Sequence, residues 1–278
     1  MVDKLINKNN INIGRCIYCG KQKEKLTDEH VIPYALGGSV VLKNASCENC
    51  RDITSRHEAN PLSKHWAEVR AFLKYPSRKR KFDEETFKLD VVLNNGEETT
   101  LSLKREEILG VTQFLEYSLP GFFLKDGLYK SGVTVVGIST YGFGINIKEF
   151  AYKHNIKSFQ YNYEYKNNNF ECMVARIAYC FAVQCFGPDC FKERLVLPAI
   201  LGQKDDIGYW FGGDPLGLIV PLIGCKQSVN AMSIGIYQKK NSNDRYVIVR
   251  LKFFANTNTP EYIVVAGSLK PDFELSKL

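Results

Sequence analysis

The chain has 278 residues, of which 45% are hydrophobic and 24% are charged, a balance typical of a globular protein. It contains no run of about 18 apolar residues, and the polar start MVDKLINKNNINIG lacks the apolar core of a signal peptide. These features argue against membrane-protein and secreted classes, so we expect a cytoplasmic protein with no membrane partner.

The net charge of +7 is unevenly distributed. Residues 1–81 contain 16 Lys and Arg against 8 Asp and Glu, a net charge of +8, whereas residues 82–278 contain 21 against 22, a net charge of −1. Lys and Arg side chains that neutralise phosphates release counterions, which favours binding to a polyanion. Charge alone leaves nucleic acid, an acidic protein and a membrane surface open as the polyanionic partner.

Two Cys-x-x-Cys pairs, with 27 residues between them, stand out near the start of the chain: Cys16 with Cys19 and Cys47 with Cys50. Four thiolates suit tetrahedral Zn²⁺ and leave no open coordination position, so we expect a structural zinc site. The alternative is two redox or incidental cysteine pairs. We expect the remaining cysteines to be reduced core thiols: Cys172, Cys180, Cys185, Cys190 and Cys225.

Between and after these pairs, the pattern predicts a strand, a turn, a second strand and a helix. The first strand is HVIPYAL (30–36), GGS turns the chain, and VVLKNAS (40–46) returns. The helix covers 47–60, and Asn60-Pro61 is expected to end it.

A second helix is predicted over 62–75, ending before Pro76. The basic stretch SRKRK (77–81) follows and is interpreted as a linker, either solvated or in contact with phosphates. We therefore expect two domains, 1–81 and 82–278.

The second part is predicted to mix strands and helices. Residues 86–105 form a hairpin that turns at Asn95-Gly96. The segment FECMVARIAYCFAVQCF (170–186) has the i, i+3, i+4 apolar pattern of a helix and stops at Gly187-Pro188. Other predicted strands are 132–140, 159–165, 216–224, 231–237, 245–255 and 261–267.

The strand predicted at 159–165 has one aromatic face, which we expect to pack under the 170–186 helix, with base stacking as the alternative. The predicted fold class is therefore α+β: a small zinc-tied module followed by a larger mixed α+β domain.

The combined motif C-x2-C…EHVIP-x-ALGG…N-x2-C-x2-C, within residues 14–60, resembles an HNH endonuclease with a ββα-metal core and a four-cysteine zinc site. The resemblance implies hydrolysis of phosphodiester bonds in nucleic acid, with DNA as the expected partner, and a catalytic Mg²⁺ or Mn²⁺ besides the structural Zn²⁺. It implies that His30 is the general base, Glu29 the metal-binding acid and Asn44 the middle asparagine that holds the histidine.

Two positions depart from the family pattern. Glu29 stands where Asp is usual, and Arg51 stands where Asn or His would supply the metal ligand on the helix. Asp52, His57 and Glu58 are nearby substitutes. Glu58 lies about 20° from Arg51 around a regular helix but two turns further on, and His57 lies about 120° away. We select His57 as the catalytic helix residue because of its chemistry.

Two alternative functions remain open at this point. Because Arg51 replaces a ligand, the protein could be a zinc-stabilised nucleic-acid-binding protein without cleavage. The C-terminal domain could instead sense a ligand or a partner and regulate the nuclease. The oligomeric state is not predicted.

Overall fold

The N-terminal module (residues 1–81) contains a small sheet followed by a helix. In the computed structural model, β1 (Asn10–Asn12) pairs in parallel with β3 (Val41–Ser46), and β2 (Thr27–His30) pairs antiparallel with β3. Helix α2 (Glu48–Asn60) starts directly after Cys47. The predicted order of strand, turn, strand and helix is thus confirmed. The structure describes residues 10–22, 25–78, 85–124, 132–161, 163, 165, 168–214, 223–227, 230–240 and 242–274.

The first strand differs from the prediction of 30–36, which was wrong beyond its first residue. β2 ends at His30, and Tyr34–Leu36 forms a 3₁₀ turn after Pro33. Pro33 has no N–H for a strand ladder, but its carbonyl accepts a hydrogen bond from the Leu36 N–H at 2.8 Å. Gly37 then takes φ = +76°, and a Cβ on Gly38 would lie 1.9 Å from the Ile32 oxygen. The Gly-Gly pair is therefore required by the turn.

Helix α2 ends at Asn60-Pro61 as predicted, but the chain continues in a helical form. Pro61–His65 forms a π-helical turn, in which the Trp66 N–H donates to the Pro61 carbonyl at 3.0 Å. The wider turn accommodates the missing N–H of proline. Helix α3 (Ala67–Phe72) follows, so only part of the predicted 62–75 helix is α-helical.

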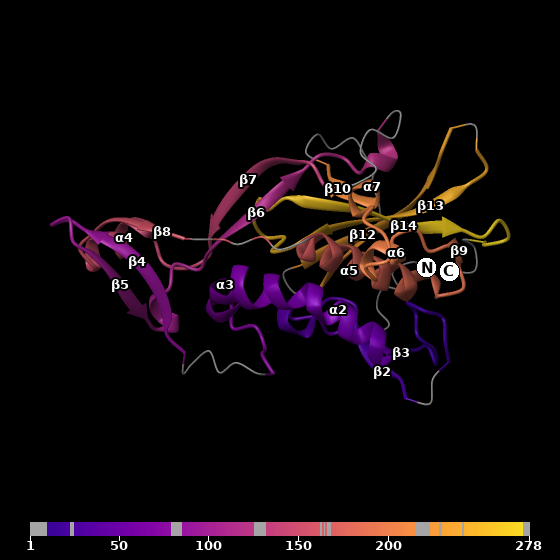
Figure 1. The fold of residues 1–278 in the computed structure, drawn as a ribbon, viewed down its shortest axis with the longest axis horizontal. Coiled ribbons are helices and arrows are strands. Elements are labelled where there is room, and N and C mark those ends of the chain that lie inside the picture. Colours follow the sequence, from indigo (N-terminus) through magenta and orange to yellow (C-terminus); the bar gives the residue numbers. More distant parts are fainter. Residues whose placement is uncertain are drawn as a thin grey trace.

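Helix α5 (Asn169–Phe186) is the central element, and its side chains are buried on all sides from Phe170 to Cys185. Figure 1 shows α2 running alongside α5, and the large sheet lying across the other side of α5. The predicted helix over 170–186 is confirmed, with Gly187 (φ = +77°) following it. A helix that is apolar all round belongs in the interior of a protein.

The large sheet has the strand order β10-β14-β13-β12-β11, and β9 pairs with β14. Strand predictions at 231–237, 245–255 and 261–267 are confirmed by β12, β13 and β14, whereas most of the strand predicted at 216–224 lies outside the described residues. The elements here are β9 (Phe191–Glu193), α6 (Leu197–Ile200), α7 (Ile207–Trp210), β10 (Phe211–Gly213), β11 (Ile223–Gln227), β12 (Asn230–Gln238), β13 (Arg245–Lys252) and β14 (Glu261–Leu269).

A smaller lobe projects from one end of the molecule (Figure 1). Its sheet has the order β5-β4-β8, and the predicted hairpin with its turn at Asn95-Gly96 is confirmed. The pair β6–β7 connects this lobe to the rest and includes the strand predicted at 132–140. The elements are β4 (Phe87–Leu93), β5 (Glu98–Leu103), a 3₁₀ turn (Arg105–Glu107), β6 (Val111–Tyr117), a 3₁₀ turn (Gly121–Phe123), β7 (Val135–Gly142), α4 (Ile147–Lys153) and β8 (Ile156–Gln160).

The aromatic segment 159–165 was wrongly predicted, both as a strand and in its packing. Only its first two residues belong to β8. Tyr161 donates to Glu68 at 3.0 Å, and Tyr163 donates to the Val111 carbonyl at 2.8 Å. These rings therefore pack against α3 and β6 rather than under α5.

One hydrophobic core joins the N-terminal module to the rest of the chain. Buried side chains of the module, such as Ile17 and Trp66, belong to the same cluster as those of α5 and the large sheet. The division into domains at residue 81 stays a prediction, and residues 79–81 of the basic linker lie outside the described part. The two sides of that division share a core.

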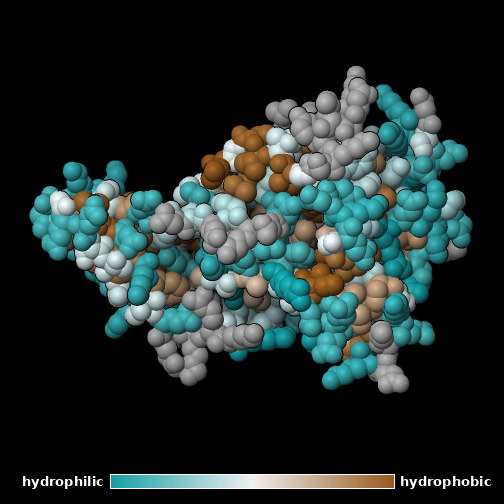
Figure 2. All heavy atoms as spheres, viewed as in Figure 1, coloured by the Kyte–Doolittle hydropathy of each residue, from teal (hydrophilic) through white to brown (hydrophobic). Residues whose placement is uncertain are grey.

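The surface of β7 is apolar, with Val135, Val136 and Ile138 exposed. Figure 2 shows this hydrophobic area over the β6–β7 pair.

Among the described residues, no helix is long and apolar enough to cross a bilayer.

Because Trp66 links the module to the large sheet, its removal should destabilise the whole fold. Its side chain is 1% exposed and packs against Phe114, Phe170, Phe253 and Phe254. We expect Trp66→Ala to lower the free energy of unfolding by about 3–5 kcal/mol, measured by urea denaturation. The half-buried Trp210→Ala is the control and should cost less. A loss below about 1 kcal/mol for Trp66→Ala would contradict the shared core.

Candidate metal centre and active site

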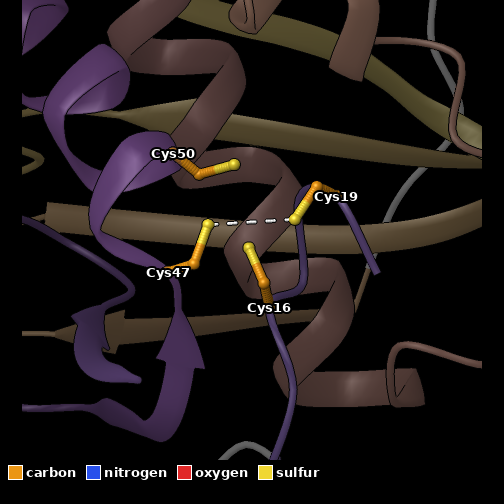
Figure 3. Close-up of side chains that lie close together, drawn as sticks. All are labelled: Cys16, Cys19, Cys47 and Cys50. Atoms are coloured by element: carbon orange, nitrogen blue, oxygen red, sulfur yellow. Dashed lines mark hydrogen bonds between the residues drawn. The ribbon is translucent and has the colours of Figure 1, made fainter. Parts of the chain in front are cut away.

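The four paired cysteines converge on one point (Figure 3). Cys16 and Cys19 lie on a tight turn, while Cys47 precedes α2 and Cys50 lies in its first turn. Their sulfur atoms all lie within 4.8 Å of one another, and Cys19 Sγ is 3.8 Å from Cys47 Sγ. A tetrahedron with Zn–S bonds of about 2.3 Å separates its sulfurs by about 3.8 Å. All four are free thiols, so the set fits a zinc ion.

The backbone around this cluster fixes the first cysteine pair. The Gly20 N–H donates to the Cys16 carbonyl at 2.9 Å, with Gly20 at φ = +74°, and the Ile17 N–H donates to Ala45 of β3 at 2.8 Å. Burial raises the pKa of the Cys16 and Cys50 thiols. Zinc binding must therefore release protons, and its affinity should fall at low pH.

The turn between Cys16 and Cys19, called the zinc turn below, also contacts α5. Tyr179 of α5 donates to the Ile17 carbonyl at 2.8 Å, and the Tyr18 hydroxyl lies 3.5 Å from Cys180 Sγ. Arg194 donates to the same Ile17 carbonyl at 3.4 Å. The zinc cluster is thereby attached to the C-terminal part of the chain.

His30 lies at the end of β2 and is half-buried. Its Nδ1 is buried with no hydrogen-bond partner among the residues described, and its ring lies 5.8 Å from that of Tyr34. Burial lowers the pKa of His30, with help from the Arg78 and Arg176 charges, and this outweighs a backbone hydrogen bond at Gly38 and the Glu58 charge, which raise it. The imidazole is therefore neutral at pH 7 and able to accept a proton.

Glu29 points to the opposite side of β2, as strand alternation requires, and its side chain is 9% exposed. Arg176 of α5 holds it, with Nη1 at 2.6 Å from Glu29 Oε1. The same Nη1 donates to the His30 carbonyl at 2.8 Å, and Nη2 lies 2.7 Å from Glu58 Oε1 of α2. Burial raises the pKa of Glu29 to about 7, while the Arg176 charge opposes this shift.

The catalytic divalent ion does not fit this arrangement. The guanidinium of Arg176 already lies against the carboxylates of both Glu29 and Glu58, and its side chain is 1% exposed. Arg51 is on the surface, paired with Glu48 and Asp52. The positive charge between Glu29 of β2 and Glu58 of α2 is thus the side chain of Arg176 and not a metal ion.

Asn44 and His57 are engaged elsewhere. The Asn44 amide donates to Asn12 Oδ1 at 3.0 Å, and its backbone N–H donates to Asp28 at 3.0 Å, with φ = +50°. It therefore ties β1 to β3, and no hydrogen bond joins it to His30 in the described structure.

For His57, Nε2 donates to the Ile200 carbonyl at 2.9 Å, and Nδ1 lies 3.2 Å from Asn169 Oδ1. His57 thus attaches α2 to the start of α5 and to α6. Glu58, rather than His57, shares a partner with Glu29.

Arg176 was not anticipated from the sequence. It is the single Lys or Arg in the 170–186 helix, which is otherwise almost entirely apolar. A lone arginine in a helix that must be buried indicates a buried carboxylate partner, and this signal was available. The sequence did not indicate which carboxylate.

Comparison with known proteins gives a match over the segment that carries this site. Residues 16–67 match the family model described as HNH endonuclease. No curated protein and no solved structure matches the chain. The matched segment contains the four-cysteine cluster, Glu29, His30 and Asn44. Within the N-terminal module, residues 16–67 are therefore similar to HNH endonucleases.

The cluster predicts about one zinc ion per chain. Cys47→Ser should lose that ion and destabilise the module, because structural zinc contributes about 10–16 kcal/mol of binding free energy in small domains. Elemental analysis and thermal unfolding measure both effects. The control is Cys172→Ser, a buried thiol outside the cluster, which should keep the zinc. Natively purified protein without zinc would contradict the assignment.

Proposed function

We propose that this protein is an endonuclease that hydrolyses phosphodiester bonds in DNA, with His30 as the general base. The observation that carries the proposal is the neutral, half-buried His30 at the end of β2, inside the segment that matches the HNH endonuclease family. A neutral imidazole can take the proton from an attacking water, which typically contributes about 10²- to 10⁴-fold in rate.

The charge distribution supports a nucleic-acid substrate. The N-terminal module carries a net charge of +8, against −1 for the rest of the chain. Phosphate neutralisation by such a surface would make binding weaken steeply as salt is added. The module that contains His30 is also the one that would contact the phosphates.

A requirement for Mg²⁺ or Mn²⁺ is part of the proposal, because HNH nucleases use metals. In the described arrangement Arg176 holds Glu29, so our mechanism assigns only the proton transfer at His30.

The specific alternative is nucleic-acid binding without cleavage. It is favoured by Arg51 at the position of the helix ligand and by the Arg176 ion pair at Glu29. Plasmid cleavage separates the two functions, because a binding protein would shift DNA in a gel without nicking it.

We expect the wild-type chain to nick plasmid DNA in Mg²⁺ or Mn²⁺, and His30→Ala to lose about 10²- to 10⁴-fold of that rate. Zinc content, DNA binding and melting temperature should be unchanged in the variant, since His30 is not one of the four clustered ligands. His154→Ala, on the projecting lobe, is the histidine control and should cut normally. Cleavage by His30→Ala at the wild-type rate would reject His30 as the base.

The lowered pKa of His30 predicts the pH dependence of the reaction. Because the base must be neutral, and its pKa lies below the ordinary value of about 6.5, the rate at limiting substrate should fall to half of its plateau only below about pH 6.5. Initial rates of nicking above and below this pH test the prediction, and a half-maximal rate above pH 7 would contradict it.

A further inference from the structure

Arg176 of α5 lies between two carboxylates of the N-terminal module. Its Nη1 is 2.6 Å from Glu29 Oε1 on β2, and its Nη2 is 2.7 Å from Glu58 Oε1 on α2. We propose that Arg176 is an internal cation that masks a divalent-metal site formed by Glu29 and Glu58. The inference that this contact inhibits the protein rests on the proposed nuclease function.

The charges at this position favour a second, stronger cation. Two carboxyl groups face one guanidinium, so the single positive charge of Arg176 cannot balance both groups when both are ionised. A divalent ion would balance both carboxylates, whose oxygens are the hard ligands that Mg²⁺ and Mn²⁺ prefer.

The geometry also suits a metal site. Glu29 comes from a strand and Glu58 from the helix, and both approach a single guanidinium, so their carboxylates converge. The Glu58 side chain is 24% exposed, whereas that of Arg176 is 1% exposed. The site is thus near the surface on the helix side and closed by α5.

The masking is coupled to the position of α5. One turn after Arg176, Tyr179 and Cys180 contact the zinc turn at Ile17 and Tyr18. Arg176 can therefore leave the carboxylates only if this part of α5 moves away from the module or the side chain is removed. A factor that displaces α5 would open the site.

The experiment uses full-length, zinc-loaded protein and Mn²⁺ alone as the probe. Wild-type protein should bind Mn²⁺ only weakly at this site, because the ion must compete with Arg176 for both carboxylates. Arg176→Gln, which removes the charge but keeps a donor, should melt at a lower temperature because two carboxylates lose their cation. It should bind one Mn²⁺ at least about tenfold more tightly than wild type. At about 100 times the dissociation constant, Mn²⁺ should raise its melting temperature by about 5–10 °C.

Three control variants test whether the gain of Mn²⁺ binding comes from loss of the Arg176 charge. Arg176→Lys keeps a positive charge and should gain no Mn²⁺ site. Arg176→Gln combined with Glu58→Gln should lose the Mn²⁺ response. Tyr179→Phe loosens α5 at the same module without changing charge. An equal gain of Mn²⁺ binding in Tyr179→Phe would overturn the proposal, because the response would then follow from helix loosening.

Wild-type protein also gives a direct test if Arg176→Gln fails to fold. If wild type binds one Mn²⁺ tightly, and Glu29→Gln abolishes this binding, the masking proposal is overturned.

Cleavage assays separate this proposal from the nuclease function. If Arg176→Gln binds Mn²⁺ and neither protein cuts DNA, the masking stands and the nuclease function fails. If wild type cuts and Arg176→Gln gains no Mn²⁺ binding, the masking fails and the nuclease function stands.

Discussion

The arrangement of this protein depends on one buried arginine. Helix α5 is apolar on all sides and lies between α2 and the large sheet, so Arg176 in its middle has no access to water. A buried guanidinium is strongly unfavourable unless carboxylates pair with it. Glu29 and Glu58 meet this requirement, and they belong to the first strand and the helix of the zinc-tied module. The need to pair Arg176 therefore fixes the module against α5.

The module is held in two physically different ways. The four cysteines close its own chain around one point, and the side chains of Ile17 and Trp66 enter the core shared with the C-terminal sheet. A zinc ion bound by these cysteines would add local order to this polar segment. The shared core then gives it a defined orientation. The module therefore docks on the rest of the chain by its interior surface.

The same docking explains why the neighbours Glu29 and His30 differ in environment. Strand alternation turns Glu29 toward α5 and leaves His30 half-buried on the other side. Burial keeps the imidazole neutral, whereas the acid is paired with Arg176. A proton acceptor is thus available while the carboxylate that would hold a metal is occupied. In our proposal, the nuclease is closed while Arg176 pairs with Glu29 and open when this pair is separated.

The sequence by itself determined the features that depend on local spacing. The two Cys-x-x-Cys turns, the order of strand, turn, strand and helix, the 87–103 hairpin and the buried helix 169–186 follow from residue patterns within a few turns of chain. Only the tertiary structure decided which partners these elements meet. Arg176 and Glu29 are 147 residues apart in the sequence, His57 bonds to Asn169 and Ile200, and the 159–165 aromatics pack on α3 and β6. Such pairings arise from packing among distant segments, and periodicity records only that a side chain is buried, not what it is buried against.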